Sequence, residues 1–459
     1  MSDLRSRSEA PISRTAWAVA SVMALGGFLG NMDGSIVAIG LESMRASLHT
    51  GLAEIQWVAT AYLLGLSAVL PLTPWLARGL GAGRLWLYAL AAFILTSAVC
   101  ALAPTAPLLI AARAVQGMTA GVLVAAGQTV IGLAVGPARL GRMMATLGLV
   151  VGLAPIVGPS VGGFLLAHLS WPALFWLNVP IGAVAMLLGL RLVPRGDRSR
   201  PPPMDWPGLA LVTAGLPLLV YGLTSFGDPL CAVPGLVSLA VFVWRSWREA
   251  HPVLDLRLIN RPVMAAGLLS VLLSGAGMLG AVLLLPLWFQ LRLGLGSVST
   301  GLLLVPLGLG TTAIMLVAGR LTDRYGGGTV ATAGSLVVLA GTAPFPWLGP
   351  HTPMALVQAL LTVRGAGIGL TMMPAMTAAY ASVRPAALSD ATALANIAMR
   401  AGGAIGGALC VVVLSHGLTA GPAAGFTSAF AVLGVICLLA TVSSAWLRHA
   451  ELLASPKEI

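Results

Sequence analysis

The segment from Ala16 to Leu41 is a long apolar stretch that carries one formal charge, the carboxylate of Asp33. About 20 apolar residues are enough to cross the hydrocarbon core of a bilayer as a helix. A carboxylate inside such a helix is costly, so Asp33 is a candidate functional group. The alternative is a purely structural group, paired once or placed near a water-filled opening, and the remainder of the chain is needed to decide.

The composition excludes a soluble globular protein. Hydrophobic residues make up 58% of the 459 residues and charged residues only 8%, against roughly 25% in typical soluble domains. The apolar stretches are continuous rather than alternating, which indicates helices and not the strands of a membrane barrel. We therefore predict an all-α polytopic membrane protein.

Fourteen apolar segments, separated by turn signals, are the predicted membrane helices. They form two six-helix bundles with two additional helices between them, because a charged, proline-rich linker follows the sixth segment. The predicted parts are an N-terminal tail (1–15), a first bundle (16–193), a linker (194–205), two additional helices (206–247), a second linker (248–262), a second bundle (263–447) and a C-terminal tail (448–459).

The basic residues predict the orientation of the chain. If the N-terminus is cytoplasmic, twenty of the 25 Lys and Arg residues fall in segments that fourteen helices place on the cytoplasmic side. Such an excess is what the positive-inside rule describes. Both tails are then cytoplasmic, and the net charge of +11 needs no nucleic-acid partner to explain it.

Other chemistries find little support in the chain. The four cysteines lie in apolar segments without metal-type spacing, so neither a disulfide nor a zinc site is expected. The phosphate-binding pattern G-x-x-x-x-G-K-[ST] does not occur, so ATP is not expected to bind. Any work that the protein does would then draw on an ion gradient. We expect no metal and no cofactor.

A weak internal repeat relates the two bundles. The segment 74–81 (PWLARGLG) follows the second predicted helix, and the segment 319–326 (GRLTDRYG) follows the tenth. Two helices further on, each half carries an intramembrane arginine, Arg113 or Arg364. Repeated six-helix halves are typical of secondary transporters, whose substrate site lies between the halves near the middle of the membrane.

Several short motifs are distributed along the whole chain. They are MDGSIV at 32–37, QW at 56–57 with AYLL at 61–64, RAVQG at 113–117, GPSVGG at 158–163, Phe175 with NVPIG at 178–182, Gln290 with Gly294, Gly301 and Pro306, and NIAMRAGGAIGG at 396–407. With these motifs the chain resembles the major facilitator superfamily and, within it, the fourteen-span drug:proton antiporters. GPSVGG is the most specific of them.

The resemblance implies a function. A protein of this kind exports hydrophobic, drug-like compounds, with cationic ones among the candidates, in exchange for protons. It is a multi-pass protein of the bacterial cell membrane, in contact with lipids, expected to be a monomer and not an enzyme. Two alternatives remain: a dedicated exporter of one self-made metabolite or antibiotic, and a polytopic membrane enzyme, for which the chain shows no catalytic cluster or soluble loop.

Asp33 and Arg113 are the candidates for proton coupling or cation recognition. Burial raises the pKa of a carboxylate and a nearby cation lowers it, so a carboxylate that faces two sides in turn can load and release a proton. The resemblance implies that Asp33 takes part in coupling or in recognising cationic drugs. Arg113 either tunes such an acid or pairs statically with backbone carbonyls, and the sequence leaves the partner of Asp33 open.

Two further motifs concern movement. Gly158, Pro159, Gly162 and Gly163 form the antiporter motif, which indicates either a hinge or a close-packing face. The second group, at the cytoplasmic ends of the tenth and eleventh helices, is a predicted gate, with a solvated turn as the alternative. Its first-half copy departs from the family pattern, because Pro74 and Arg78 replace a glycine and an aspartate. The gate residues are Gly319, Asp323, Arg324 and Gly326.

Polar and amphipathic side chains within the apolar segments are candidates for lining a substrate cavity. Trp57 fits equally well as an interfacial anchor. The candidates are Gln56, Trp57, Tyr62, Gln116, Gln290, Asn396 and Arg400.

Overall fold

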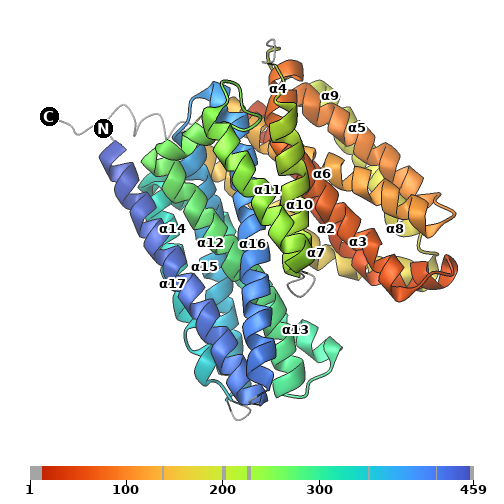
Figure 1. Ribbon diagram of the computed structural model, residues 1–459, viewed down its shortest axis with the longest axis vertical. Helices are drawn as coiled ribbons and strands as arrows, with labels where there is room; N and C mark the ends of the chain where they lie inside the picture. The colour runs from red at the N-terminus through yellow and green to blue at the C-terminus, as the bar shows by residue number, and fades with distance from the viewer. Residues whose placement is uncertain are drawn as a thin grey trace.

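The computed structural model describes residues 13–136, 139–198, 203–224, 229–349, 352–419 and 421–454. Every regular element in these ranges is helical, which confirms the predicted all-α fold (Figure 1). Eleven helices of the described part are long and apolar enough to cross a membrane. The count of fourteen spans and the cytoplasmic position of the tails stay predictions. Residues 1–12 and 455–459 of those tails, and 199–202 of the linker, lie outside the described residues.

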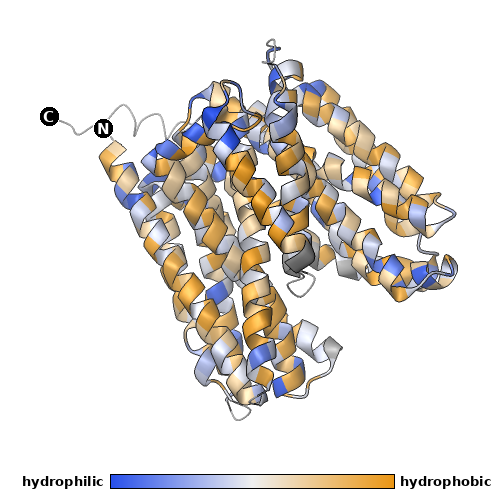
Figure 2. Cartoon of the chain, in the orientation of Figure 1, coloured by the Kyte–Doolittle hydropathy of each residue, from blue (hydrophilic) through white to orange (hydrophobic). Residues whose placement is uncertain are grey.

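The outer surface of the bundle is apolar. Hydrophobic residues cover the helices along their length, and hydrophilic ones gather toward the helix ends (Figure 2). Leu95, Leu187 and Val442 are each exposed by 60% or more on this surface. An apolar surface of this extent is suited to lipid and not to water. The protein is therefore a multi-pass membrane protein.

The first bundle is built from pairs of long helices. Within it α2 packs on α7, α3 packs on α6, and α5 packs on both α6 and α9. Its elements are α2 (Arg14–Ser47), α3 (Leu52–Val69), η1 (Leu70–Leu72), α4 (Thr73–Leu80), α5 (Ala82–Ala101), α6 (Ala106–Val135), α7 (Leu140–His168), α8 (Ala173–Trp176) and α9 (Asn178–Leu192).

The second bundle repeats this packing. Here α12 packs on α16, α13 packs on α15, and α14 packs on both α15 and α17. Its elements are α12 (Pro262–Leu287), η4 (Trp288–Arg292), α13 (Ser297–Tyr325), α14 (Gly327–Thr342), η5 (Phe345–Trp347), α15 (Met354–Ala381), η6 (Pro385–Ala387), α16 (Leu388–Leu418) and α17 (Pro422–Ala454).

A helical hairpin lies across the outside of the junction between the bundles (Figure 1). It consists of α10 (Trp206–Thr224) and α11 (Pro229–Arg248), and the short η3 (Leu256–Asn260) follows it. Helix α10 contacts α3 of the first bundle and α16 of the second. The ring of Trp57 on α3 stacks on Tyr221 of α10, with 5.3 Å between the ring centroids.

The turns of the internal repeat have the same backbone. Gly81 joins α4 to α5 with φ +83° and ψ 136°, and Gly326 joins α13 to α14 with φ +85° and ψ 152°. Side chains with a Cβ rarely adopt this conformation, so glycine is required at both turns. The two segments that resemble one another in sequence therefore also fold alike.

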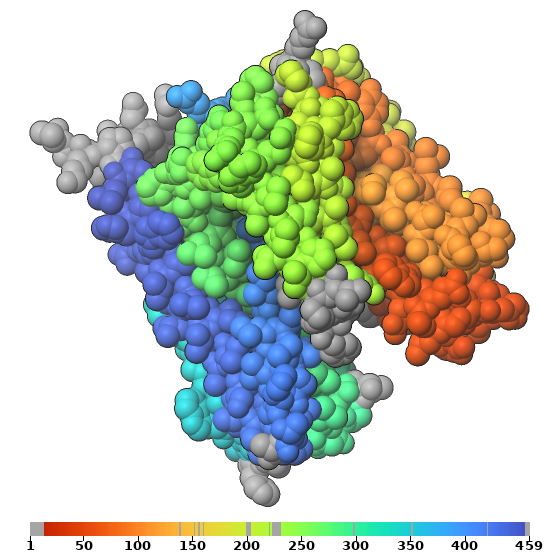
Figure 3. Space-filling model, viewed as in Figure 1, coloured from red at the N-terminus to blue at the C-terminus, as the bar shows by residue number. Residues whose placement is uncertain are grey.

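The apolar core shows how the bundles are joined. The largest cluster of buried hydrophobic residues contains side chains from both bundles, for example Leu147 of the first and Met376 of the second. Two smaller clusters, around Phe175 and around Phe430, are each confined to one bundle. The bundles accordingly share a core toward one end and splay apart toward the other, where the molecular surface is notched between them (Figure 3).

The close approach of α3 and α6 generates a stability prediction. A Cβ at Gly117 would collide with the backbone of Tyr62 on α3, whereas a Cβ at Gly434 on α17 would have no heavy atom within 4 Å. We expect Gly117→Ala to lower the free energy of unfolding by about 1–3 kcal/mol, the usual cost of overpacking. Thermal unfolding of the purified protein in detergent measures this change.

Gly434→Ala is the matched control. It makes the same chemical change in a helix, where alanine is intrinsically favoured over glycine by about 1 kcal/mol. We expect the midpoint of its thermal unfolding to be equal to or above that of the wild-type protein. Equal midpoints for the two variants would contradict the packing of α3 on α6.

Candidate functional site

A buried ion pair joins α2 to α6 in the first bundle. Asp33 and Arg113 are both fully buried, and Nη1 of Arg113 donates a hydrogen bond to Oδ2 of Asp33. The Nε of Arg113 donates to the carbonyl oxygen of Val58 on α3 at 3.0 Å. The guanidinium carbon lies 4.1 Å from the ring centroid of Tyr62. Arg113 is thus the partner of Asp33 that the sequence left open.

Two amides complete the surroundings of the carboxylate. Nδ2 of Asn178 donates to Oδ1 of Asp33 at 2.6 Å, and Nε2 of Gln116 donates to the same oxygen at 3.2 Å. The Oε1 of Gln116 accepts from Nη1 of Arg113 at 2.7 Å, and its Nε2 also donates to the hydroxyl of Ser97 at 2.7 Å. Both oxygens of the buried carboxylate thus have hydrogen-bond donors.

Asn178 and Ser97 belong to this network, yet they were not among the candidate residues. Asn178 is the first residue of α9, and both side chains are fully buried. The signal for Asn178 was present, because an amide at the start of an apolar helix must find a partner. Ser97 gave no comparable signal, since a serine in a membrane helix can satisfy itself on its own backbone.

Small residues bring the network together. A Cβ at Gly65 on α3 would collide with the carbonyl of Ala114 on α6, and a Cβ at Gly117 would collide with Tyr62 in return. This reciprocal contact lets the backbones of α3 and α6 approach, as small residues commonly do in membrane bundles. The hydroxyl of Tyr62 can then reach α2, where it donates to the carbonyl of Gly30 at 2.5 Å.

The antiporter motif lies against the helix that carries Asp33. A Cβ at Gly158 of α7 would stand 3.1 Å from the Cβ of Ser35, and one at Gly162 would stand 2.7 Å from Cγ1 of Ile36. A Cβ at Gly163 would meet no atom within 4 Å. The side chain of Pro159 lies outside those described. Two glycines of the motif therefore set the distance between α7 and the Asp33 segment of α2.

Two of the four predicted gate residues, Gly319 and Asp323, lie where the bundles meet, whereas Gly326 lies next to Glu451 within the second bundle. The carboxylate of Asp323 at the end of α13 accepts from Nε of Arg142 on α7 at 2.8 Å, so its partner is across the junction and is not the adjacent Arg324. Arg324 lies over the ring of Tyr325 at 5.2 Å. A Cβ at Gly319 would be 2.7 Å from the Cα of Arg142, so glycine allows the close contact of α13 with α7.

A second ion pair crosses the same junction. Nη1 of Arg78 on α4 donates to Oδ2 of Asp390 in the first turn of α16 at 2.7 Å. We refer to Arg78–Asp390 and Arg142–Asp323 as the gate pairs. The carboxylate side chain of each pair is only 4% exposed.

The gate pairs are related by the internal repeat, with their charges exchanged. Arg78 occupies the fifth position of segment 74–81, and Asp323 the fifth position of segment 319–326. Arg142 is the third residue of α7, and Asp390 is the third residue of α16. The departure of Arg78 from the family pattern therefore removes no pair, because an acid stands opposite it.

The remaining cavity candidates do not form one site. Asn396 is buried and donates from Nδ2 to Oε1 of Gln128 across the junction at 2.7 Å. Arg400, one turn further along α16, is partly buried and has no hydrogen bond at Nε among the described residues. Gln56 and Gln290 are exposed on different bundles and do not join the network.

The fold and this network define a membrane transporter of two repeated bundles, and the comparison with known proteins agrees. The Major Facilitator Superfamily profile matches residues 23–407, so the chain belongs to this superfamily. The solved structure of the proton:xylose symporter XylE bound to 6-bromo-6-deoxy-D-glucose has the same fold, with a TM-score of 0.68, 14% sequence identity, and coverage of 95% of this chain and 98% of that chain.

Curated relatives narrow the family. The chain is 32% identical over 410 residues to the multidrug resistance protein B homolog of Mycobacterium tuberculosis, covering 86% of this chain and 76% of the relative. It is 33% identical over 465 residues to the puromycin resistance protein pur8 of Streptomyces alboniger, covering 95% of this chain and 92% of the relative. These matches confirm the resemblance to the drug-efflux members of the superfamily.

The Asp33–Arg113 pair generates a second prediction. Removing one partner of a buried pair leaves an uncompensated charge and typically costs about 3–5 kcal/mol. We expect Asp33→Asn to lower the midpoint of thermal unfolding strongly. The double variant Asp33→Asn with Arg113→Gln should lose less stability than the two single variants lose when their losses are added. A double-mutant cycle by thermal unfolding in detergent measures this coupling.

The exposed pair of Glu42 and Arg45 on α2 offers a control. Pairs on the surface contribute little, so Glu42→Gln should leave the midpoint unchanged. Strictly additive losses in the Asp33 and Arg113 cycle would show that the two side chains do not stabilise one another.

Proposed function

We propose that this protein exports hydrophobic, drug-like compounds in exchange for protons, by alternating access of a site between its two bundles. The observation that carries the proposal is the buried ion pair of Asp33 and Arg113. It lies in a protein whose two bundles share an apolar core at one end only. The relatives named for multidrug and puromycin resistance support a drug-like substrate.

Asp33 is the proposed proton site. While it is ionised, its carboxylate neutralises Arg113 and links α2 to α6 and to Asn178 of α9. When it takes up a proton, Arg113 loses its counter-charge in a buried place, which is costly. The bundle would then be driven to rearrange around α2, and α7 would follow because Gly158 packs directly on that helix.

The gate pairs are the proposed cytoplasmic lock. Both join the first bundle to the second at the end where the bundles share their core, so both must break before that end can open. With the N-terminus in the cytoplasm, as the basic residues predict, this structure is closed to the cytoplasm. The opposite end, where the bundles separate, is then the side of substrate release.

Two alternatives are retained. A dedicated exporter of one self-made metabolite would use the same machinery, and transport assays with a panel of unrelated compounds distinguish it from a multidrug exporter. A membrane enzyme is disfavoured, because the acid of the buried network is already bound by Arg113 and two amides. We expect transport without cofactor and without chemical change of the substrate, by a monomer.

Efflux from vesicles driven by a proton gradient tests the role of Asp33. We expect Asp33→Asn to lose the part of efflux that depends on the gradient, because the asparagine cannot take up and release a proton. Glu42→Gln, which neutralises an exposed acid of the same helix, should keep the wild-type rate. The measurement is the rate of substrate movement with the gradient intact and with it collapsed by an ionophore.

Each result has a separate meaning. If Asp33→Asn keeps gradient-dependent efflux at the wild-type rate, Asp33 is not the coupling group, although the protein is still a transporter. Wild-type efflux that does not respond to collapse of the pH gradient would contradict proton coupling altogether.

A cross-link tests the movement of the bundles. The hydroxyl oxygens of Thr129 on α6 and Thr392 on α16 lie 3.0 Å apart across the junction, within reach of a disulfide after substitution. We expect Thr129→Cys with Thr392→Cys to lose efflux on oxidation and to regain it on reduction. The two single variants should be insensitive to oxidant, and full activity of the cross-linked protein would contradict opening at this end.

A further inference from the structure

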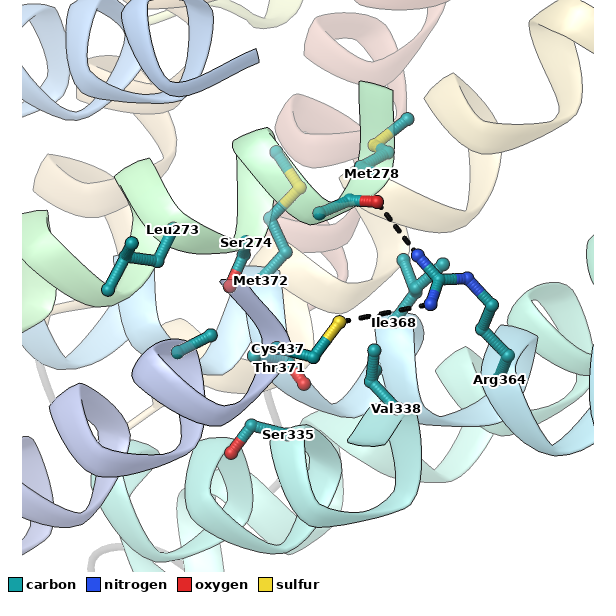
Figure 4. Close-up of a pocket in the computed structure, with 12 residues that line it drawn as sticks. Leu273, Ser274, Met278, Ser335, Val338, Arg364, Ile368, Thr371, Met372 and Cys437 are labelled. Atoms are coloured by element: carbon teal, nitrogen blue, oxygen red, sulfur yellow. Dashed lines mark hydrogen bonds between the residues drawn. The ribbon is translucent and has the colours of Figure 1, made fainter. Parts of the chain in front are cut away.

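A small cavity lies inside the second bundle, away from the Asp33 network (Figure 4). Twelve residues from α12, α14, α15 and α17 line it, and none of them is acidic. The cavity offers about 30 Å³ to the centres of water-sized particles, enough for one or two of them. It can hold a small ion and is too small for a drug-like compound.

The charge in its wall belongs to Arg364. This side chain is 1% exposed, and it forms no ion pair among the described residues. Its Nη2 donates to the carbonyl oxygen of Gly277 at 2.8 Å, and its Nη1 donates to the hydroxyl of Thr342 and faces Sγ of Cys437 at 3.9 Å. These contacts satisfy hydrogen bonds, but they are all neutral and leave the positive charge uncompensated.

Two donors of the wall are unused. The Nε of Arg364 and the hydroxyl of Ser274 are buried atoms without a hydrogen-bond partner in the described part of the chain. The other hydroxyls of the wall donate to their own helices, Ser335 to the carbonyl of Thr332 at 3.0 Å and Thr371 to that of Gly367 at 2.8 Å. A positive cavity with spare donors has the chemistry of an anion site and would repel a cation.

The first bundle shows what is missing in the second. Arg113 and Arg364 hold corresponding places, on α6 and α15, and each contacts the first helix of its bundle. In the first bundle that helix presents the carboxylate of Asp33. In the second it presents Gly277, where a Cβ would be 3.6 Å from its nearest neighbour, Sγ of Cys437. A Cβ fits there without a clash, but no carboxylate of the described residues supplies the counter-charge.

We propose that this cavity is a binding site for a small monovalent anion, of which chloride is the probe of choice. The anion neutralises Arg364 as Asp33 neutralises Arg113, and the unused hydroxyl of Ser274 is a further donor in the wall of the same cavity. The proposal concerns the stability and packing of the second bundle, and it does not depend on transport or on proton coupling.

Chloride binding to the purified full-length protein in detergent tests the site. Radioactive chloride should bind saturably, and the thermal midpoint should rise by about 2 °C for each tenfold increase in chloride above its dissociation constant. Gluconate replaces chloride at constant ionic strength in the reference samples. Absence of saturable binding, with equal midpoints in chloride and gluconate, would overturn the proposal and leave water as the occupant.

Variants at Gly277 give the decisive comparison. Gly277→Asp supplies the carboxylate within the chain, so it should abolish chloride binding and make the midpoint independent of chloride. Gly277→Ala adds only the Cβ and should bind chloride as the wild type does. Arg364→Gln should also lose chloride binding. If that variant does not fold, the comparison of the two Gly277 variants still tests the proposal. Wild-type chloride binding by Gly277→Asp would overturn the assignment of the anion to this cavity.

Discussion

The ion pair between Asp33 and Arg113 is the interaction on which the first bundle depends. Two opposite charges that are both fully buried stabilise each other only if their remaining hydrogen bonds are made inside the protein. Asn178 and Gln116 make those bonds to the carboxylate, and Val58 accepts from the guanidinium. A single change of protonation at the centre is therefore felt by several helices.

The two ends of the molecule are held differently, and this difference is what an alternating-access protein needs. At one end the bundles share an apolar core and are joined by the gate pairs. At the other end each bundle has a core of its own. Opening of the first end would have to break the gate pairs and also separate the apolar contacts that surround them.

The internal repeat is preserved in geometry while its charges vary. Across the junction the acid and the base have exchanged bundles, so that Arg78 faces Asp390 where Asp323 faces Arg142. Inside the bundles the arginine is kept on both sides, at Arg113 and Arg364, whereas the acid is present only in the first. The two bundles thus share their helix packing and differ in their buried charges.

The sequence by itself determined the class of the protein. The scarcity of charge and the continuous apolar segments were enough to predict an all-α membrane protein, because lipid permits few other structures. The superfamily was indicated by the resemblance that the motifs from Met32 to Gly407 carry. The carboxylate of Asp33 could be recognised as a candidate site because it is the single formal charge of its apolar segment. Tertiary structure decided the partners: that Asp33 meets Arg113, that Arg78 meets Asp390, and that Arg364 meets no acid in the described chain. These contacts join residues 80 or more positions apart, and helical periodicity carries no information over such distances.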